Sequence, residues 1–224
     1  MIYKLPYDKK EKDFILFLKL MENGGHAIDI GANIGVMTYH FAKKSGNTIV
    51  YSFEPVPLNY GILQRVVQKY KLKNVLTYNL ALGDKKGSVG MLIPKKGDVI
   101  LHGLSHIADK KGSSEGEQVS IEMVKLDDVQ ELKDKPVTAI KIDVEGYEFF
   151  VLQGAQHIIQ QNKPMMYMEL WDSDMREKCI GLLESWSYKG YINTNGHLKL
   201  YDGEKYVQNF FFIHKECEQR MKLL

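Results

Sequence analysis

Short apolar runs of strand length alternate along this chain with longer runs of helical periodicity, and this alternation limits the possible folds most. The strand-like runs are apolar on both faces, which is typical of strands covered by helices on both sides. The pattern predicts a doubly wound α/β fold with a mostly parallel sheet. Strands are expected at 26–30, 48–53, 75–80, 138–144 and 164–170, and helices at 36–44, 58–70, 147–161 and 174–186.

Both ends of the chain carry further signals. Residues 8–22 place apolar side chains at helical spacing, and Gly24 and Gly25 follow them as a C-cap would. Near the other end, Asn195-Gly196 lies between two alternating segments, which is a strong hairpin signal, and a strand-like run follows at 206–214. We therefore expect an N-terminal helix within residues 1–25 and antiparallel strands at the end of the sheet.

Residues 83–128 interrupt the alternation between the third and the fourth expected core strands. This segment has two short strand-like pieces around a loop rich in Gly, Ser, Lys and His, and we interpret it as too polar for the core. Long loops inside compact domains usually serve a function. We predict a single domain over residues 1–224, in which 83–128 is an insertion that forms a substrate loop.

Composition excludes several classes of protein. The 224 residues are 44% hydrophobic and 26% charged, which suits a globular core, and a net charge of +2 gives little support for a nucleic-acid or membrane partner. Cys179 and Cys217 show no metal-type spacing, so we interpret them as free thiols in a reducing compartment. The first residues lack the apolar core of a signal peptide, and no run reaches membrane-spanning length. We expect a cytoplasmic protein.

The first strand-to-helix turn reads DIGANIG, from Asp29 to Gly35. In a doubly wound sheet this turn is where a nucleotide binds, and its dinucleotide form is G-x-G-x-x-G. Here Asn33 stands where recognition of a pyrophosphate requires a residue without a side chain, which counts against NAD or FAD. The turn therefore favours a ligand that has no pyrophosphate.

Glu54 ends the second expected strand, where a carboxylate can accept hydrogen bonds from both hydroxyls of a ribose. Together with the turn, Glu54 predicts a nucleoside ligand such as S-adenosylmethionine, whose ammonium group Asp29 would face directly or through water. The alternative interpretation is that Asp29 and Asn33 only cap the following helix.

Three acidic residues are expected to collect at the same edge of the sheet. Asp143 and Glu145 come at the end of the fourth core strand, and Glu169 ends the fifth. Residues two apart in a strand point the same way, so Asp143 and Glu145 are expected to face one cavity. The three acids would position a substrate hydroxyl or accept its proton, with Glu145 nearest the substrate and Asp143 in contact with cofactor or substrate. A divalent-metal site is the weaker proposal, and we predict none.

Histidines in the insertion are further candidates for a catalytic base. His102 and His106 titrate near neutrality, and their loop would fold over the pocket, although a surface histidine without a role is the commoner case. Tyr147 and Trp171, near strand ends, are candidates for the wall of an acceptor pocket.

Six blocks of sequence resemble the FkbM-type S-adenosylmethionine-dependent methyltransferases: DIGANIGVMT, FEPVPLNYGILQ, ALGDKKG, VKLDDV, IKIDVEGYEFFVLQGA and MYMELW. The resemblance implies a Rossmann-like, seven-stranded class I methyltransferase sheet with an antiparallel final hairpin. It also implies O-methylation of a sugar, a glycan or another small-molecule hydroxyl. The cofactor-binding residues that it implies are Asp29, Gly31, Asn33 and Gly35 at the methionine end, Glu54 at the ribose, the segment from Asn79 to Ala81 at the adenine, and, within the matched blocks, Thr38, Pro55 and Asp143.

Three other functions remain open from the sequence. A nucleic-acid methyltransferase acting on a ribose hydroxyl would need Lys or Arg concentrated beside the pocket. A nucleotide-binding or scaffolding module would have kept the fold and lost catalysis, since fold does not establish function. An NAD-dependent oxidoreductase would have to accommodate Asn33.

Overall fold

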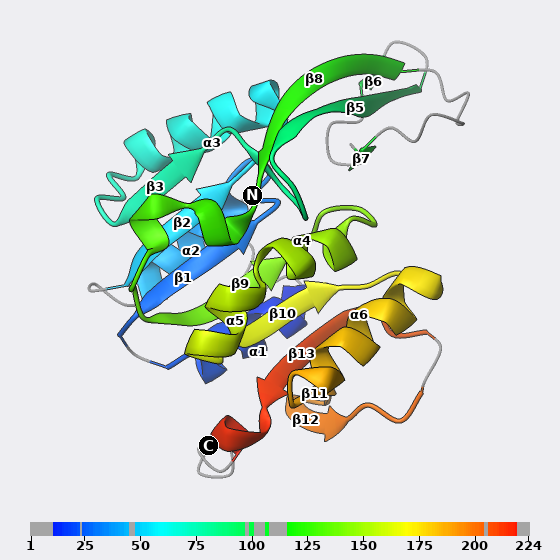
Figure 1. The fold of residues 1–224 in the computed structure, drawn as a ribbon. Coiled ribbons are helices and arrows are strands. Elements are labelled where there is room, and N and C mark those ends of the chain that lie inside the picture. The colour runs from blue at the N-terminus through cyan, green and yellow to red at the C-terminus, as the bar shows by residue number, and fades with distance from the viewer. Residues whose placement is uncertain are drawn as a thin grey trace.

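The computed structural model describes residues 11–22, 24–44, 48–96, 99–100, 106–107, 116–203 and 206–218. Its centre is an eight-stranded sheet in the order β12-β11-β13-β10-β9-β1-β2-β3 (Figure 1). The strands are β1 His26–Ile30, β2 Ile49–Phe53, β3 Val75–Tyr78, β9 Val137–Ile142, β10 Met165–Glu169, β11 Tyr188–Thr194, β12 His197–Leu200 and β13 Asn209–His214. From β10 to β3 neighbouring strands are parallel, whereas β13, β11 and β12 join antiparallel.

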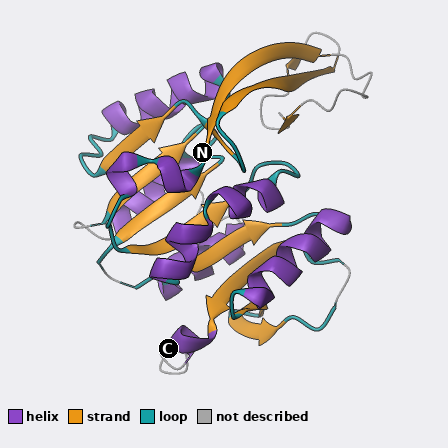
Figure 2. Ribbon diagram, in the orientation of Figure 1, coloured by secondary structure: helices purple, strands orange, loops and turns teal. Residues whose placement is uncertain are grey.

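Helices cover both faces of this sheet (Figure 2). They are α1 Lys12–Leu20, α2 Val36–Lys44, α3 Pro57–Lys69, α4 Glu148–Gly154, α5 Gln156–Asn162 and α6 Asp174–Ser185, with short 3-10 turns at Leu126–Asp128, Gln130–Leu132 and Lys215–Cys217. Successive strand residues point to opposite faces. Ala27 and Val50 therefore pack with α1 and α2, while Ile28 and Tyr51 pack in the cluster that contains α4, α5 and α6. The predicted doubly wound α/β fold is confirmed.

The insertion forms a second, smaller sheet that projects from the main one (Figure 1). Its frame is the antiparallel pair β5 Gly87–Lys96 and β8 Gly116–Val124, joined by β4 Ala81–Leu82, β6 Val99–Ile100 and β7 His106–Ile107. Alternate residues of β5 and β8, among them Met91 and Met123, pack against Val56 and Ala81 in a separate apolar cluster. The prediction that this segment is too polar for a core is wrong.

Three boundaries differ from the sequence expectations. The hairpin at Asn195-Gly196 adds β12 as an eighth strand beside the seven that the family resemblance implied. Helix α1 ends at Leu20 with Met21 as its C-cap, so Gly24 and Gly25 do not cap it. The expected helix 147–161 is divided at Ala155, because the Asp127 carboxylate accepts hydrogen bonds from the backbone N–H groups that begin α5.

Two further expectations concern the cysteines and the length of the helices. Cys179 and Cys217 are both free thiols, as predicted. Of the helices that the structure describes, none combines the length and the apolar character needed to cross a bilayer.

Candidate functional site

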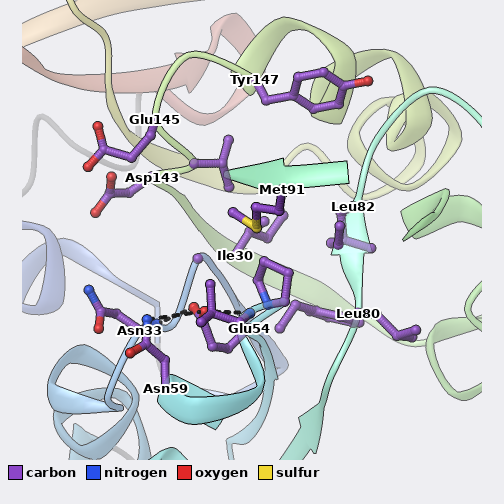
Figure 3. Close-up of a pocket in the computed structure, with 16 residues that line it drawn as sticks. Ile30, Asn33, Glu54, Asn59, Leu80, Leu82, Met91, Asp143, Glu145 and Tyr147 are labelled. Carbon is purple, nitrogen blue, oxygen red and sulfur yellow. Dashed lines mark hydrogen bonds between the residues drawn. The ribbon is translucent and has the colours of Figure 1, made fainter. Parts of the chain in front are cut away.

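A cavity opens beyond the carboxyl ends of β1 and β2, next to the end of β9 (Figure 3). This is the point where the chain order of the parallel strands reverses, the usual ligand crevice of open α/β sheets. Its walls consist of Ile30, Gly31, Asn33, Phe53, Glu54, Pro55, Val56, Asn59, Leu80, Ala81, Leu82, Met91, Asp143, Val144, Glu145 and Tyr147. One wall is apolar and the other carries acids and amides, so the cavity suits a ligand with unlike ends.

The glycine turn is fixed by backbone contacts. The N–H groups of Gly31 and Ala32 donate to the carbonyl of Phe53, at 3.0 and 2.9 Å. Gly31 has φ +73°, and a Cβ there would lie 1.8 Å from the carbonyl oxygen of Asp143. Gly35 has φ +83°, and its Cβ would lie 2.6 Å from Cδ1 of Leu63 in α3. Gly31 is required by the close approach of the Asp143 backbone, whereas at Gly35 the positive φ is the main reason for glycine.

Glu54 directly follows β2 and is buried, with 4% of its surface exposed. Its carboxylate accepts hydrogen bonds from the N–H groups of Asn33 (2.8 Å) and Val56 (2.9 Å), and the Asn59 amide lies at 3.5 Å. Burial raises the pKa of the Glu54 carboxyl, although these hydrogen bonds favour its charged form. A carboxylate offers about four acceptor positions, so Glu54 retains capacity for ligand hydroxyls.

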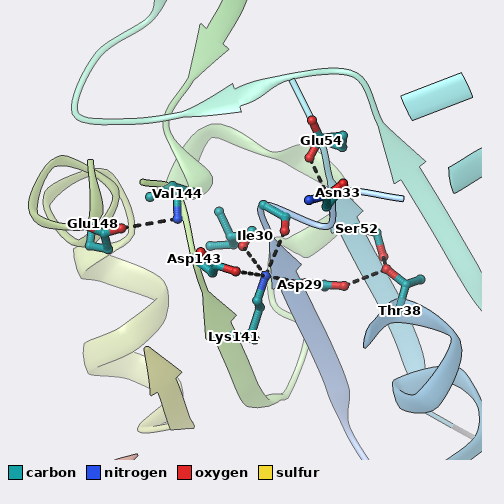
Figure 4. Close-up of polar contacts among 11 residues, drawn as sticks. Asp29, Ile30, Asn33, Thr38, Ser52, Glu54, Lys141, Asp143, Val144 and Glu148 are labelled. Carbon is teal, nitrogen blue, oxygen red and sulfur yellow. Dashed lines mark hydrogen bonds and ion pairs between the residues drawn. The ribbon is translucent and has the colours of Figure 1, made fainter. Parts of the chain in front are cut away.

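Asp29 lies beneath the turn instead of in the cavity wall. Its side chain is fully buried, and the Thr38 hydroxyl donates to its Oδ2 at 2.6 Å (Figure 4). The hydroxyls of Thr38 and Ser52 lie 3.1 Å apart and extend this network under β1 and β2. Neither Asp29 nor Thr38 is among the described residues that line the cavity.

The sequence reasoning missed Lys141, a buried lysine near the end of β9. Its Nζ lies 2.8 Å from the carbonyl oxygen of Gly31 and 3.3 Å from that of Ile30. It also lies 3.5 Å from Asp29 Oδ1 and 3.4 Å from Asp143 Oδ2 (Figure 4). Burial disfavours its charge, but the two carboxylates outweigh burial, so the pKa of Lys141 is raised. A lysine within the apolar run TAIKIDV was the available signal.

Asp143 and Glu145 both reach the cavity, where Figure 3 shows them side by side. The strand argument for this arrangement is wrong, because β9 ends at Ile142 and both acids lie in the following loop. Glu145 has φ 52°, an uncommon conformation for a residue with a side chain. Glu148 stabilises the loop by accepting hydrogen bonds from the N–H groups of Val144 and Gly146, at 3.3 and 3.0 Å.

Glu169 lies at the end of β10, outside the described lining of the cavity. Burial raises the pKa of this carboxyl to about 7, with further increases from the negative charges of Asp143 and Glu145. Asp143, Glu145 and Glu169, the three acids predicted to lie at one edge of the sheet, are therefore close enough to interact electrostatically. Among the described residues, no group of three or more His, Cys, Asp and Glu side chains is arranged to hold a metal ion.

The other sequence candidates divide between wall and support. Pro55, Ala81 and Tyr147 line the cavity. The Asn79 amide instead donates to the carbonyls of Glu54 and Pro55, at 2.8 and 2.9 Å, and so holds the end of β2. Trp171 is 51% exposed and is not among the described lining residues. His102 lies outside the described residues, and His106 is described only as a backbone position of β7.

The methyltransferase FkbM domain model matches residues 29–192, most of the chain. The chain belongs to this family. Its predicted enzyme class, a methyltransferase, is thereby confirmed, and the family supports S-adenosylmethionine as cofactor.

Curated relatives and solved structures agree with the family. Methyltransferase 1 of Beauveria bassiana is 26% identical over 176 residues, covering 68% of this chain and 71% of that protein. Methyltransferase sdnD of Sordaria araneosa is 25% identical over 195 residues, covering 75% of this chain and 73% of that protein.

The crystal structure of Methyltransferase FkbM from Methylobacillus flagellatus matches with a TM-score of 0.58 and 18% identity, over 87% of this chain but only 45% of that one. A putative Streptococcus mutans methyltransferase in complex with SAH has a TM-score of 0.52 and 8% identity, with coverages of 92% and 97%. These two structures show the shared fold.

Proposed function

We propose that this protein transfers a methyl group from S-adenosylmethionine to a hydroxyl of a sugar, a glycan or another small molecule. The observation that carries the proposal is the two-sided cavity. Glu54 is buried at its floor for a ribose, and an apolar wall that includes Leu80 and Leu82 suits an adenine ring. Asp143 and Glu145 stand at the opposite, acidic wall, where an ammonium group would be favourable.

The charges of the wall fit this cofactor better than a dinucleotide. Among the described residues that line the cavity, Glu54, Asp143 and Glu145 are acidic and none is Lys or Arg. A pyrophosphate would bring negative charge close to these carboxylates, whereas S-adenosylmethionine carries a sulfonium and an ammonium. The same charges disfavour nucleic acid as the acceptor, because phosphate binding needs nearby cations.

The proposed chemistry assigns separate tasks to the acids. The bound cofactor supplies an electrophilic methyl group on a positively charged sulfur. Glu145 positions the acceptor hydroxyl at the cavity wall, and orientation of this kind accounts for much of the acceleration of such transfers. The hydroxyl proton passes to the carboxylate of Glu145, the acid at the cavity wall beside the acceptor, while Glu169, with a pKa of about 7, lies behind this wall and outside the described lining.

Calorimetric titration tests the cofactor assignment. Wild-type protein should bind S-adenosylmethionine and S-adenosylhomocysteine but not NAD, and Glu54→Ala should weaken both by about 10- to 100-fold, since hydrogen bonds to a charged group are lost. The matched control is Asp127→Ala, which removes another carboxylate that accepts two backbone N–H groups, at the start of α5 and away from the cavity. It should leave the affinity unchanged. Folded wild-type protein that binds neither ligand would contradict the proposal.

A further inference from the structure

The two loops at the acidic end of the cavity are held in direct backbone contact. The N–H of Asp143 donates to the carbonyl of Ile30 at 3.2 Å. Gly31 is so close to Asp143 that even a Cβ would overlap the Asp143 carbonyl. The turn after β1 and the loop after β9 therefore behave as one unit, and the place of the Asp143 side chain depends on their junction.

Lys141 occupies that junction. Its ammonium group has three N–H donors and four oxygen atoms within 3.5 Å, two of them the carbonyls of Ile30 and Gly31. Its side chain is 3% exposed, so solvent does not compete for these donors. The lysine thus joins the end of β1 and the first residue of the glycine turn to the strand that leads into the loop of Asp143.

The two carboxylates beside Lys141 have different access to a ligand. Asp29 has no exposed side-chain surface, and its oxygen atoms lie against Thr38 and Lys141. Asp143 has 32% of its side chain exposed and lines the cavity. A buried carboxylate without a cation would be strongly unfavourable, so Lys141 makes the buried position of Asp29 tolerable while leaving Asp143 at the wall.

We infer that Lys141 is the positioning residue of the methionine end of the site: it keeps Asp29 beneath the glycine turn and holds Asp143 at the wall to receive the ligand's ammonium group. This inference rests on the proposed function, since it assumes a ligand with a nucleoside end and an amino-acid end. It assigns recognition of the ammonium group to Asp143 and a supporting task to Asp29.

Two ligands that share the nucleoside test this inference by calorimetry. S-adenosylhomocysteine has the amino-acid end, and 5′-methylthioadenosine lacks it. In Lys141→Met, affinity for S-adenosylhomocysteine should fall by at least about tenfold, as for loss of a charged hydrogen-bond network. Affinity for 5′-methylthioadenosine should change by less than about twofold, because Glu54 and the apolar wall remain. The control is Lys189→Met, which removes a lysine of β11 that pairs with Glu218. It should leave the affinity for both ligands unchanged.

A double variant keeps the test decisive if Lys141→Met does not fold. Asp29→Asn combined with Lys141→Met removes both buried charges, and the Thr38 hydroxyl retains an oxygen acceptor. The same selective loss is expected in this variant. Equal losses for both ligands would indicate a merely structural lysine, and unchanged affinity for both would exclude any positioning role. Wild-type protein that binds neither ligand would instead refute the cofactor assignment.

Discussion

The nucleoside side of the cavity and the hairpin beside it are built by different means. The nucleoside side lies at the ends of parallel strands and is fixed by hydrogen bonds of the turn, such as those from Gly31 and Asn33. The β5–β8 hairpin has its own apolar cluster and contributes Met91 to the cavity wall. The first region is therefore held by backbone hydrogen bonds, whereas the hairpin is held by side-chain packing in its own cluster.

The largest expected effect comes from Gly31→Ala, which tests the backbone side of this comparison. The added Cβ would overlap the Asp143 carbonyl, and φ +73° is unfavourable for alanine. We expect loss of about 3 kcal/mol of unfolding free energy and no measurable binding of S-adenosylhomocysteine.

Gly61→Ala is the matched control for this change. Gly61 lies within α3, and a Cβ there would meet no atom within 4 Å. Alanine should stabilise the helix by about 0.5 to 1 kcal/mol and preserve binding. Denaturation curves and calorimetry read both quantities, and a Gly31→Ala protein with normal affinity would show that the turn does not need this close contact.

The same contrast explains what the sequence predicted. The glycine turn and Glu54 follow local rules, because a turn with positive φ and a carboxylate at a strand end are visible in short motifs. The positions of the core strands and of α2, α3 and α6 likewise followed from periodicity. Local patterns do not contain the break at Ala155, since the Asp127 carboxylate that caps α5 comes from about 30 residues earlier in the chain.

The polar network beneath the turn was equally hidden. The lysine in the apolar run TAIKIDV is visible in the sequence, but its pairing with Asp29 and Asp143 depends on the parallel alignment of β1 and β9. The insertion was misjudged because its alternation was diluted by polar residues, although Met91 and Met123 form a buried face. Non-local pairing decided each of these features.

A smaller effect is expected from Glu169→Gln, which tests whether the acids act as one group. The pKa of Glu169 is about 7 in the folded protein, above its ordinary value of 4.5, so the folded state holds this proton more tightly. Wild-type stability from this group is therefore present below about pH 4.5 and is lost as pH rises to about 7. Gln cannot ionise, so its stability does not fall in this range. The unfolding free energy of Glu169→Gln minus that of wild type should therefore rise by about 1 kcal/mol from pH 5 to pH 8, a modest amount because solvent screens part of the repulsion.

Denaturation at the two pH values measures this gain, and an Asp143→Asn background tests its cause. Burial is the first cause of the raised pKa, and the charge of Asp143 is the second. Removing Asp143 should reduce the gain without abolishing it. A gain that is the same in both backgrounds would show that Asp143 and Glu169 are independent.

The smallest effect on ligand affinity is expected from Met91→Ala, at the contact between the two regions. Met91 is 8% exposed, packs in the hairpin cluster and also lines the cavity. Its truncation should cost about 2 kcal/mol of stability but lower the affinity for S-adenosylhomocysteine by only about threefold.

Ile93→Ala is the matched control, because Ile93 is 4% exposed in the same cluster and is not among the described residues of the cavity wall. If both variants lose stability and only Met91→Ala loses affinity, the hairpin contributes to cofactor binding through that one side chain. A large, equal loss of affinity in both would mean that the hairpin core is part of the cofactor site, and the separation of the two regions would be wrong.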